Sequence, residues 1–399
     1  MTDLAAVLAA HRVLVCVGSG GVGKTTTAAA VALWGALQGR RTVVVTIDPS
    51  KRLADCLGLN LSGVGETSVP LEIFTRDGLT PTGSLTALLV DQQSAWDAAV
   101  ERYAPTPEIR DRILANRFYQ GLSRTFAGSH EFMALDTLAT LLQRGTYDLI
   151  VLDTPPVQQA LEFLEAPMRL QQFLDSRMSK WLMRPTVERG WAALSAANRT
   201  TTFLLRKVES ATGISALGEI AEFFTTMHRM FEDFGVRFSR VSALLASQET
   251  AFLLITSPDE EVLQEAGNFR VELERMGIAL KAVVVNRVHE PWRRETNEKL
   301  NVKTLIKRIR KVLLSFEDEA TLQWLVENFL AYQALAQSEK ERVQQFSHKL
   351  SAVIPIIYVP VLQRALVDLQ GLAALHSYLF AEESAPARPQ INDASNPVS

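Results

Sequence analysis

The sequence predicts an α/β protein with a mostly parallel sheet and a helical subdomain. Short apolar runs bounded by turn residues recur along the 399 residues, and segments of helical period separate them, which is typical of parallel α/β sheets. A glycine-rich loop lies between the first run and a helix-forming stretch, and two long stretches show no strand pattern. We therefore predict a single domain over residues 1–381, with helical insertions at about 84–143 and 157–245.

The apolar runs give seven expected strands. They are Arg12 to Val17, Thr42 to Ile47, Leu71 to Phe74, Tyr147 to Leu152, Ala251 to Thr256, Leu280 to Val285 and Pro355 to Val359. The last segment, 382–399, is rich in Pro, Ser, Ala and Asn and has no periodicity. We expect this tail to be disordered, because such a composition cannot bury enough apolar surface to fold.

Composition and charge exclude several classes of function. Lys plus Arg (41) nearly balances Asp plus Glu (44), so no field of the whole molecule indicates a nucleic-acid partner or an anionic membrane. The longest apolar run, Ala28 to Leu37, is far shorter than the ~18 residues of a membrane span, so stable membrane insertion is not expected. Cys16 and Cys56 lie far apart without a CxxC pair, which favours a reducing compartment. We expect a cytoplasmic protein.

A phosphate-binding loop follows the first predicted strand. Gly18, Gly23, Lys24 and Thr25 match G-x-x-x-x-G-K-[ST], between the strand-like "RVLVCV" and the helix-forming "KTTTAAAVALWGAL". The glycines let backbone amides turn inward, and the helix adds the positive end of its dipole. We expect Lys24 to hold the β and γ phosphates and the Thr25 hydroxyl to bind Mg²⁺. The nucleotide-binding residues predicted in the loop are Gly20, Gly21, Val22, Gly23, Lys24, Thr25 and Thr26.

Two aspartates stand at the ends of predicted strands, where ligands of a parallel sheet gather. Asp153 follows the apolar "DLIVL" and has the position of a carboxylate that supports Mg²⁺ through a water. Asp48 ends the second predicted strand and would hold the attacking water in line with the γ phosphate. An Asp before Pro or in a strand-end turn is often only a cap. Two of them in a chain with this loop favour a catalytic interpretation.

The combination of motifs resembles the ArsA family, which includes arsenite-pump ATPases and ATPases that target tail-anchored membrane proteins. The motifs are "GSGGVGKTTT", "TIDPSKRLAD", "VLDTPP", "LLITSPDEEVLQEA" and "VVVNRV", and "SHEFMALDTLATLL" and "VPVLQRALVDLQGLAAL" are also similar to the family. The resemblance covers nearly the whole chain. It implies the topology of P-loop NTPases of the MinD and ArsA type.

The resemblance also implies partners and further site residues. It implies ATP and Mg²⁺ as cofactors, a switch I centred on Asp48 and a switch II that begins at Asp153. Asn286 would recognise adenine and the loop around Pro360 would cover the base, although without the resemblance Asn286 is an ordinary strand-end cap. Family members act as twofold arrangements, so with one loop in this chain a homodimer is implied. The family's groove for a hydrophobic client corresponds to the second insertion.

Ser19 departs from the family pattern. The usual loop is G-K-G-G-V-G-K, and its first lysine reaches the nucleotide of the partner chain, but here Ser19 has that position. Serine is uncharged and short, so a contribution to transition-state charge that is worth ~10³ or more in rate is missing. Lys51 and Arg52 are the nearest basic residues, and they are equally well explained as solvated loop charges. The sequence predicts ATP binding more firmly than fast hydrolysis.

Several alternatives stay open. The chain would otherwise be a nucleotide-binding scaffold with little turnover, a positioning ATPase of the MinD and ParA kind, or a kinase or synthetase with its own acceptor pocket. The cysteines cannot form an arsenite site, so an oxyanion pump of the usual kind is not expected. The methionines and aromatic residues between Met168 and Met230 form either a client groove or a plain helical core. His130 and the basic segment 302–314 have structural explanations at least as good as functional ones.

Overall fold

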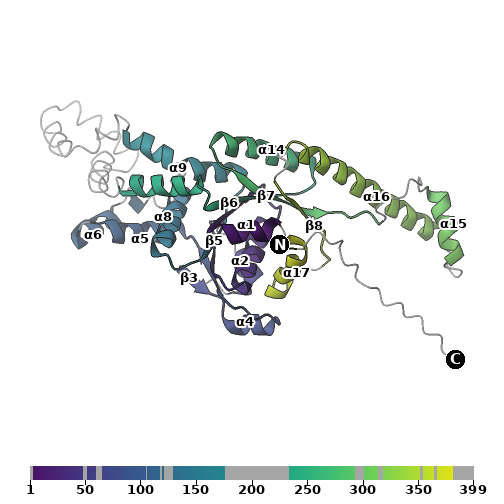
Figure 1. The fold of residues 1–399 in the computed structure, drawn as a ribbon, viewed down its shortest axis with the longest axis horizontal. Coiled ribbons are helices and arrows are strands. Elements are labelled where there is room, and N and C mark those ends of the chain that lie inside the picture. The colour runs from purple at the N-terminus through teal and green to yellow at the C-terminus, as the bar shows by residue number, and fades with distance from the viewer. Residues whose placement is uncertain are drawn as a thin grey trace, which may run out of the picture.

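The computed structural model describes residues 3–47, 52–59, 65–104, 106–116, 119–120, 129–175, 233–292, 301–312, 318–350, 354–363 and 366–380. Within these residues an eight-stranded sheet has the order β3-β4-β2-β5-β1-β6-β7-β8 (Figure 1). β3 pairs antiparallel with β4, and every other pair is parallel. The predicted fold class is confirmed.

Six of the seven predicted strands are confirmed. They are β1 (Val13–Gly18), β2 (Arg41–Thr46), β5 (Leu149–Asp153), β6 (Thr250–Thr256), β7 (Leu280–Val288) and β8 (Ile356–Pro360). β1, β5 and β6 are buried along their whole length. Their uninterrupted apolar sequences follow from helices that cover both faces of the sheet.

The prediction was wrong at one edge of the sheet. Leu71–Phe74 is not a strand but belongs to helix α4 (Leu71–Arg76), which starts after Pro70. Phe74 is buried while Leu71 is 63% exposed, a one-sided burial that suits a short surface helix. The two strands beside β2 are β4 (Ser84–Leu89) and β3 (Gly65–Ser68). β4 therefore lies inside the stretch from 84 to 143 that was expected to contain only helices.

Helices cover both faces of the sheet (Figure 1). On one face, α1 (Asp3–Ala10), α2 (Lys24–Leu37), α3 (Arg52–Leu57) and α17 (Leu369–Leu379) share a core with the sheet. On the other face the core is formed with α5 (Gln92–Tyr103), α6 (Pro107–Ala115), α8 (Ser129–Arg144), α9 (Val157–Asp175), α14 (Glu260–Arg275) and α16 (Glu319–Ser347). The sheet thus separates two apolar cores.

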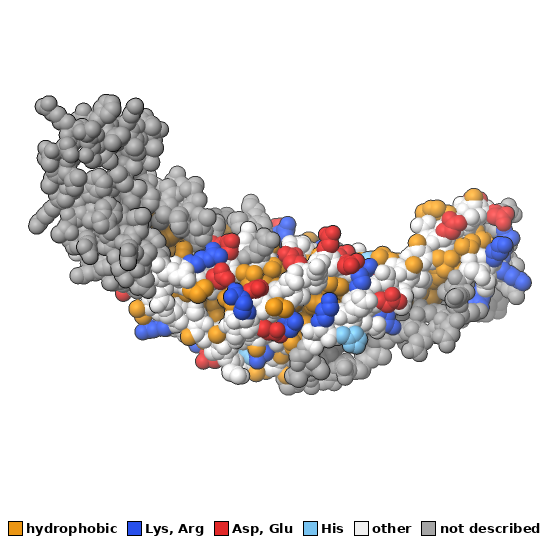
Figure 2. All heavy atoms as spheres, turned by 90° about the horizontal axis from the view of Figure 1, so that it is seen from above, with side chains coloured by type: hydrophobic (Ala, Val, Ile, Leu, Met, Phe, Trp, Pro, Cys, Tyr) orange, Lys and Arg blue, Asp and Glu red, His pale blue; other side chains and the backbone are white. Residues whose placement is uncertain are grey.

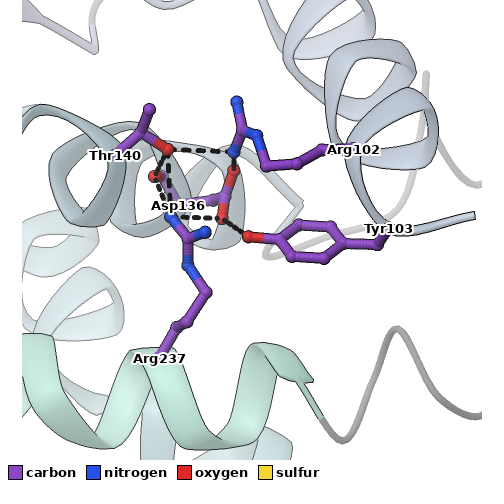
Figure 3. Close-up of polar contacts among 5 residues, drawn as sticks. All are labelled: Arg102, Tyr103, Asp136, Thr140 and Arg237. Carbon is purple, nitrogen blue, oxygen red and sulfur yellow. Dashed lines mark hydrogen bonds and ion pairs between the residues drawn. The ribbon is translucent and has the colours of Figure 1, made fainter. Parts of the chain in front are cut away.

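A buried carboxylate joins the helices of the second layer (Figure 3). Asp136 of α8 is 4% exposed and accepts hydrogen bonds from Arg102 at 2.9 Å and from Tyr103 at 3.3 Å. Arg237, in the helix 233–245, forms an ion pair with the same carboxylate at 3.3 Å. Thr140 accepts further hydrogen bonds from both arginines. The network fixes α5, α8 and the helix 233–245 relative to one another.

The remaining predictions about helices concern the basic segment and the client groove. The basic segment forms α15 (Val302–Val312), which packs on α16 beyond β8 and exposes Lys303, Lys307 and Arg310 (Figure 1). Acidic and basic side chains are interspersed over the face formed by α14 and α16 (Figure 2). Residues 176–232, with most of the expected client groove, lie outside the described residues, as does the tail 382–399. No helix in the described ranges is both long and apolar enough to cross a membrane.

Candidate functional site

The phosphate-binding loop connects β1 to α2 and depends on glycine at two positions. Gly21 and Gly23 have φ angles of 77° and 97°, which favour glycine. A Cβ atom on Gly23 would also collide with the side-chain nitrogen of Asn286. The loop therefore has the left-handed turns and the close approach that the motif requires, and α2 starts at Lys24 with its N-terminus toward the loop.

Two buried polar groups lie inside the loop. The Lys24 side chain is 8% exposed, and its Nζ donates a 2.8 Å hydrogen bond to the carbonyl oxygen of Ser19. Ser19 is 5% exposed, and its hydroxyl has no hydrogen-bond partner among the residues that the structure describes. A buried hydroxyl without an internal partner is costly, so it fits a loop that contacts a polar ligand such as a phosphate. The residues present therefore fit a nucleoside triphosphate.

Asp153 ends β5 beside the loop. It is 1% exposed, and its carboxylate accepts a hydrogen bond from Thr46 Oγ1 at 3.0 Å. The register of the sheet places Asp153 next to Cys16 of β1 and Thr46 of β2. Burial and the nearby Asp153 carboxylate raise the pKa of Cys16, while Lys24 lowers it, so both charges act on the end of β1. A buried carboxylate at a strand end beside the phosphate loop fits an outer ligand of Mg²⁺.

The segment after Asp153 is tied to the loop. Thr154 donates to the Cys16 carbonyl oxygen from its hydroxyl at 2.8 Å and from its backbone nitrogen at 3.3 Å. A Cβ atom on Gly20 would come within 4.0 Å of the Pro156 ring. α9 begins at Val157, directly after this proline. Thus α9, which belongs to the helical layer, begins only four residues after Asp153, which lies beside the phosphate loop.

Asn286 lies on the other side of the loop. Its Nδ2 donates to the Val22 carbonyl oxygen at 2.8 Å, and its Oδ1 accepts from the backbone nitrogen of Arg287 at 2.9 Å. The pairing of β7 with β8 shifts register between Val285 and Val288, so this dipeptide forms a bulge. The first bond uses one of the two N–H groups of Nδ2, and the second uses one of the two lone pairs of Oδ1. Asn286 therefore keeps one N–H donor and one acceptor lone pair for a ligand.

A pocket of about 290 Å³ opens beside Asn286. Its lining comes from the start of α2, from the β7 bulge, from the end of β8 and the residues after it, and from α17 with the residue Leu366 before it, namely Gly23, Thr26, Thr27, Asn286, Arg287, Val359, Pro360, Val361, Leu362, Leu366, Leu375 and Leu379. Ligand pockets usually start at ~300 Å³, so this one suits a nucleobase better than a whole nucleotide. The structure brings Pro360 to the same pocket as Asn286.

Sequence reasoning did not identify Arg287 or the α17 leucines as pocket residues. Arg287 follows Asn286 directly, but its side chain lines the pocket only because of the bulge, which has no sequence signal of its own. The leucines of α17 have the ordinary pattern of a core-facing helix. Their contribution could be found only from the packing of α17 on α2.

Some predicted residues have no described place. Asp48 and Lys51 lie outside the described residues, and so does the side chain of His130. Arg52 begins α3 and is exposed. Cys16 and Cys56 are both buried, and Cys56 Sγ lies 4.0 Å from Thr26 Oγ1. Among the described residues no group of three or more His, Cys, Asp or Glu side chains could hold a metal ion.

Comparison with known proteins links this arrangement to one family. The family model described as anion-transporting ATPase matches residues 11–324. A putative arsenical pump-driving ATPase 1 of Aquifex aeolicus is 23% identical over 388 residues, covering 93% of this chain and 79% of the relative. An ATPase GET3 of Malassezia globosa is 24% identical over 278 residues, covering 69% and 72%. A Streptomyces coelicolor protein without an assigned function, SCO2128, is 31% identical over 192 residues, covering 45% and 44%.

Proposed function

Because the chain belongs to the ArsA family of anion-transporting ATPases, we propose that it is a Mg²⁺-dependent, ATP-driven switch that acts as a homodimer. The predicted resemblance to this family and the prediction of an ATPase are confirmed. The observation that carries the proposal is the convergence of Lys24, Asp153 and Asn286 at the carboxyl edge of one parallel sheet. Ligands of such sheets bind at this edge.

The phosphate end of the site has the side chains for binding and hydrolysis. Lys24, held on the Ser19 carbonyl, would exchange this partner for the β and γ phosphates. Thr25 and, through a water, Asp153 would hold Mg²⁺, which would neutralise charge that develops on the phosphates. Asp48 would orient the attacking water. The amides of residues 20–26 would complete the cradle.

The base end has the chemistry to select adenine. Asn286 offers one donor and one acceptor side by side, which matches the acceptor N7 and the donor N6 amino group of adenine. Guanine has an acceptor oxygen in place of that amino group. Pro360 and its apolar neighbours would cover the base.

The connection from Asp153 to α9 supports the idea of a switch. Thr154 is anchored on β1, Pro156 lies beside Gly20, and α9 follows at once. A shift of the loop on nucleotide binding would therefore move the start of α9, and with it the helical layer. We propose that this layer binds a hydrophobic client in the cytoplasm, as the family resemblance implies. The single ATPase domain over 1–381 belongs to the same proposal.

Ser19 favours a second candidate, an ATP-binding scaffold with little turnover. A serine at this position brings no charge to the partner's nucleotide, and its hydroxyl is buried in its own loop. Binding would then control assembly while hydrolysis stayed slow.

Turnover as a function of protein concentration tests the proposal. The rate of Mg²⁺-dependent ATP hydrolysis per chain should rise with concentration, because two chains close on each other, and Asp48→Asn should abolish it. Ser19→Lys should increase the rate by restoring the missing charge. ATP binding with negligible turnover in all three proteins would favour the scaffold, and no ATP binding would contradict both candidates.

A further inference from the structure

We propose that Arg287 stacks its guanidinium on the adenine that Asn286 recognises, and thereby determines affinity for the base. The inference rests on the proposed function, because it assigns a specificity-determining residue to the ATP site. It concerns a side chain that neither the phosphate-loop motif nor the switch aspartates include.

The charge inventory of the base pocket singles out Arg287. Of the twelve described residues that line the pocket, Arg287 is the one with a charged side chain, and the others are a glycine, two threonines, an asparagine and apolar residues. The Arg287 side chain has no ion pair or hydrogen bond with another described residue. It is exposed at the pocket, so its guanidinium can meet a ligand without breaking a contact to any described residue.

The backbone holds Arg287 in an unfavourable conformation. Its φ angle is 61°, and among the described residues no other non-glycine has a positive φ. Such a conformation costs free energy for a residue with a Cβ atom, and glycine would adopt it without this cost. The bulge between β7 and β8 imposes it, since the same turn directs the Arg287 amide to Asn286 Oδ1. An arginine at a strained position beside a ligand pocket is a functional candidate.

The other walls of the pocket indicate contact with the base and not with the phosphates. Val359 in β8 and Val361 and Leu362 directly after it supply apolar surface, and Leu366 extends it. Stacking the flat face of a purine between this apolar surface and a guanidinium removes little water from the polar groups of the base. The cation also interacts favourably with the ring face. The phosphate loop has its own buried cation, Lys24.

The test uses three ligands that separate the two halves of ATP. Dissociation constants for Mg-ATP, adenosine and tripolyphosphate are measured by calorimetry or by competition, for the wild type, Arg287→Gly and Arg287→Lys. Glycine removes the side chain and suits the φ angle, so a thermal melt should show an equal or higher midpoint. Lysine keeps the charge and removes the planar group.

Stacking predicts a specific pattern. Arg287→Gly should bind ATP and adenosine about three- to tenfold more weakly, the range expected for one cation–π contact, and Arg287→Lys should lose a smaller part of the affinity because it keeps the charge without the planar group, with tripolyphosphate unchanged in both. Unchanged adenosine binding in Arg287→Gly would overturn the inference, and weaker tripolyphosphate binding would assign Arg287 to the phosphates instead. Reduced turnover with unchanged binding of all three ligands would also overturn it. A wild type that does not bind ATP would instead contradict the proposed function.

Discussion

The two ends of the candidate site are built in different ways. At the phosphate end, Ser19, Lys24 and Asp153 are each at least nine-tenths buried and belong to the loop after β1, to the start of α2 and to the end of β5, the strand next to β1 in the sheet. At the base end, Asn286 is half-buried and Arg287 is exposed, and the pocket collects residues from four separate parts of the chain.

The difference in construction implies that the phosphate end serves catalysis and the base end serves selection of the nucleotide. The phosphate end is specified by a short motif and by the register of neighbouring strands. The base end depends on one bulge, one loop and the position of α17. We therefore expect substitutions at the phosphate end to abolish activity and substitutions at the base end to alter affinity and specificity.

Lys24→Ala should have the largest effect. It removes the buried cation of the loop, and we expect ATP and tripolyphosphate to bind at least about a hundredfold more weakly. Calorimetric titration measures both ligands, and circular dichroism checks that the fold is kept. Adenosine binding should be unchanged, and a comparable loss for adenosine would show that the two ends are not separate.

Asp153→Asn should have the next largest effect. The amide is similar in size but lacks the charge that would support Mg²⁺ through a water, and losing such an outer ligand typically costs 10- to 100-fold. We expect ATP turnover to fall by about this factor and the Mg²⁺ concentration for half-maximal turnover to rise. Thr46→Val, which removes only the hydrogen bond to this carboxylate, is a matched control with a smaller expected effect. An unchanged Mg²⁺ dependence in Asp153→Asn would contradict this role.

Asn286→Ala should weaken ATP binding by about tenfold and reduce the preference for ATP over GTP, because the donor and acceptor for adenine are lost. Competition binding with the two triphosphates measures both quantities. Tripolyphosphate should bind as in the wild type. If ATP and tripolyphosphate lost affinity equally, Asn286 would act by supporting the loop at Val22 and not by contacting the base.

The smallest expected effect is a pH dependence of stability near the base end. His376 of α17 lies 2.8 Å from the Ala30 carbonyl oxygen of α2, and burial lowers its pKa below the usual 6.5. The unfolded chain therefore binds a proton at higher pH than the folded chain, so stability falls as pH decreases through and below about 6.5. Thermal melts from pH 7.5 to 5.5 measure this fall in stability, and the melting midpoint of His376→Gln should depend less on pH. An equal slope in the variant would exclude His376 as the cause.

The sequence predicted the centre of the molecule better than its edges. Short continuous apolar runs such as that of β6 are typical of strands that are covered on both faces of a sheet. The central strands could therefore be predicted. The segment Leu71–Phe74 is too short for its hydrophobic periodicity to distinguish a helix from a strand. It forms a helix because of Pro70 before it and the burial of Phe74. The sequence does not predict β4, because its apolar residues run almost directly into the helical pattern of α5.

The candidate site shows the same division. Lys24 and Thr25 could be predicted because the spacing of the motif determines the conformation of the loop. Asp153 could be predicted from its place at the end of a strand. Asn286 could be inferred only through the family resemblance. Arg287 could not be inferred, because a one-residue shift in the pairing of β7 with β8 decides which way its side chain lies.

Hydrogen–deuterium exchange with and without Mg-ATP tests most directly whether nucleotide binding at this edge acts on the helical layer. We predict slower exchange in residues 18–26 and 286–287, together with a change in α9 between 157 and 175, and neither change in Lys24→Ala. A change confined to the loop and the base pocket, with α9 unaffected, would contradict the switch.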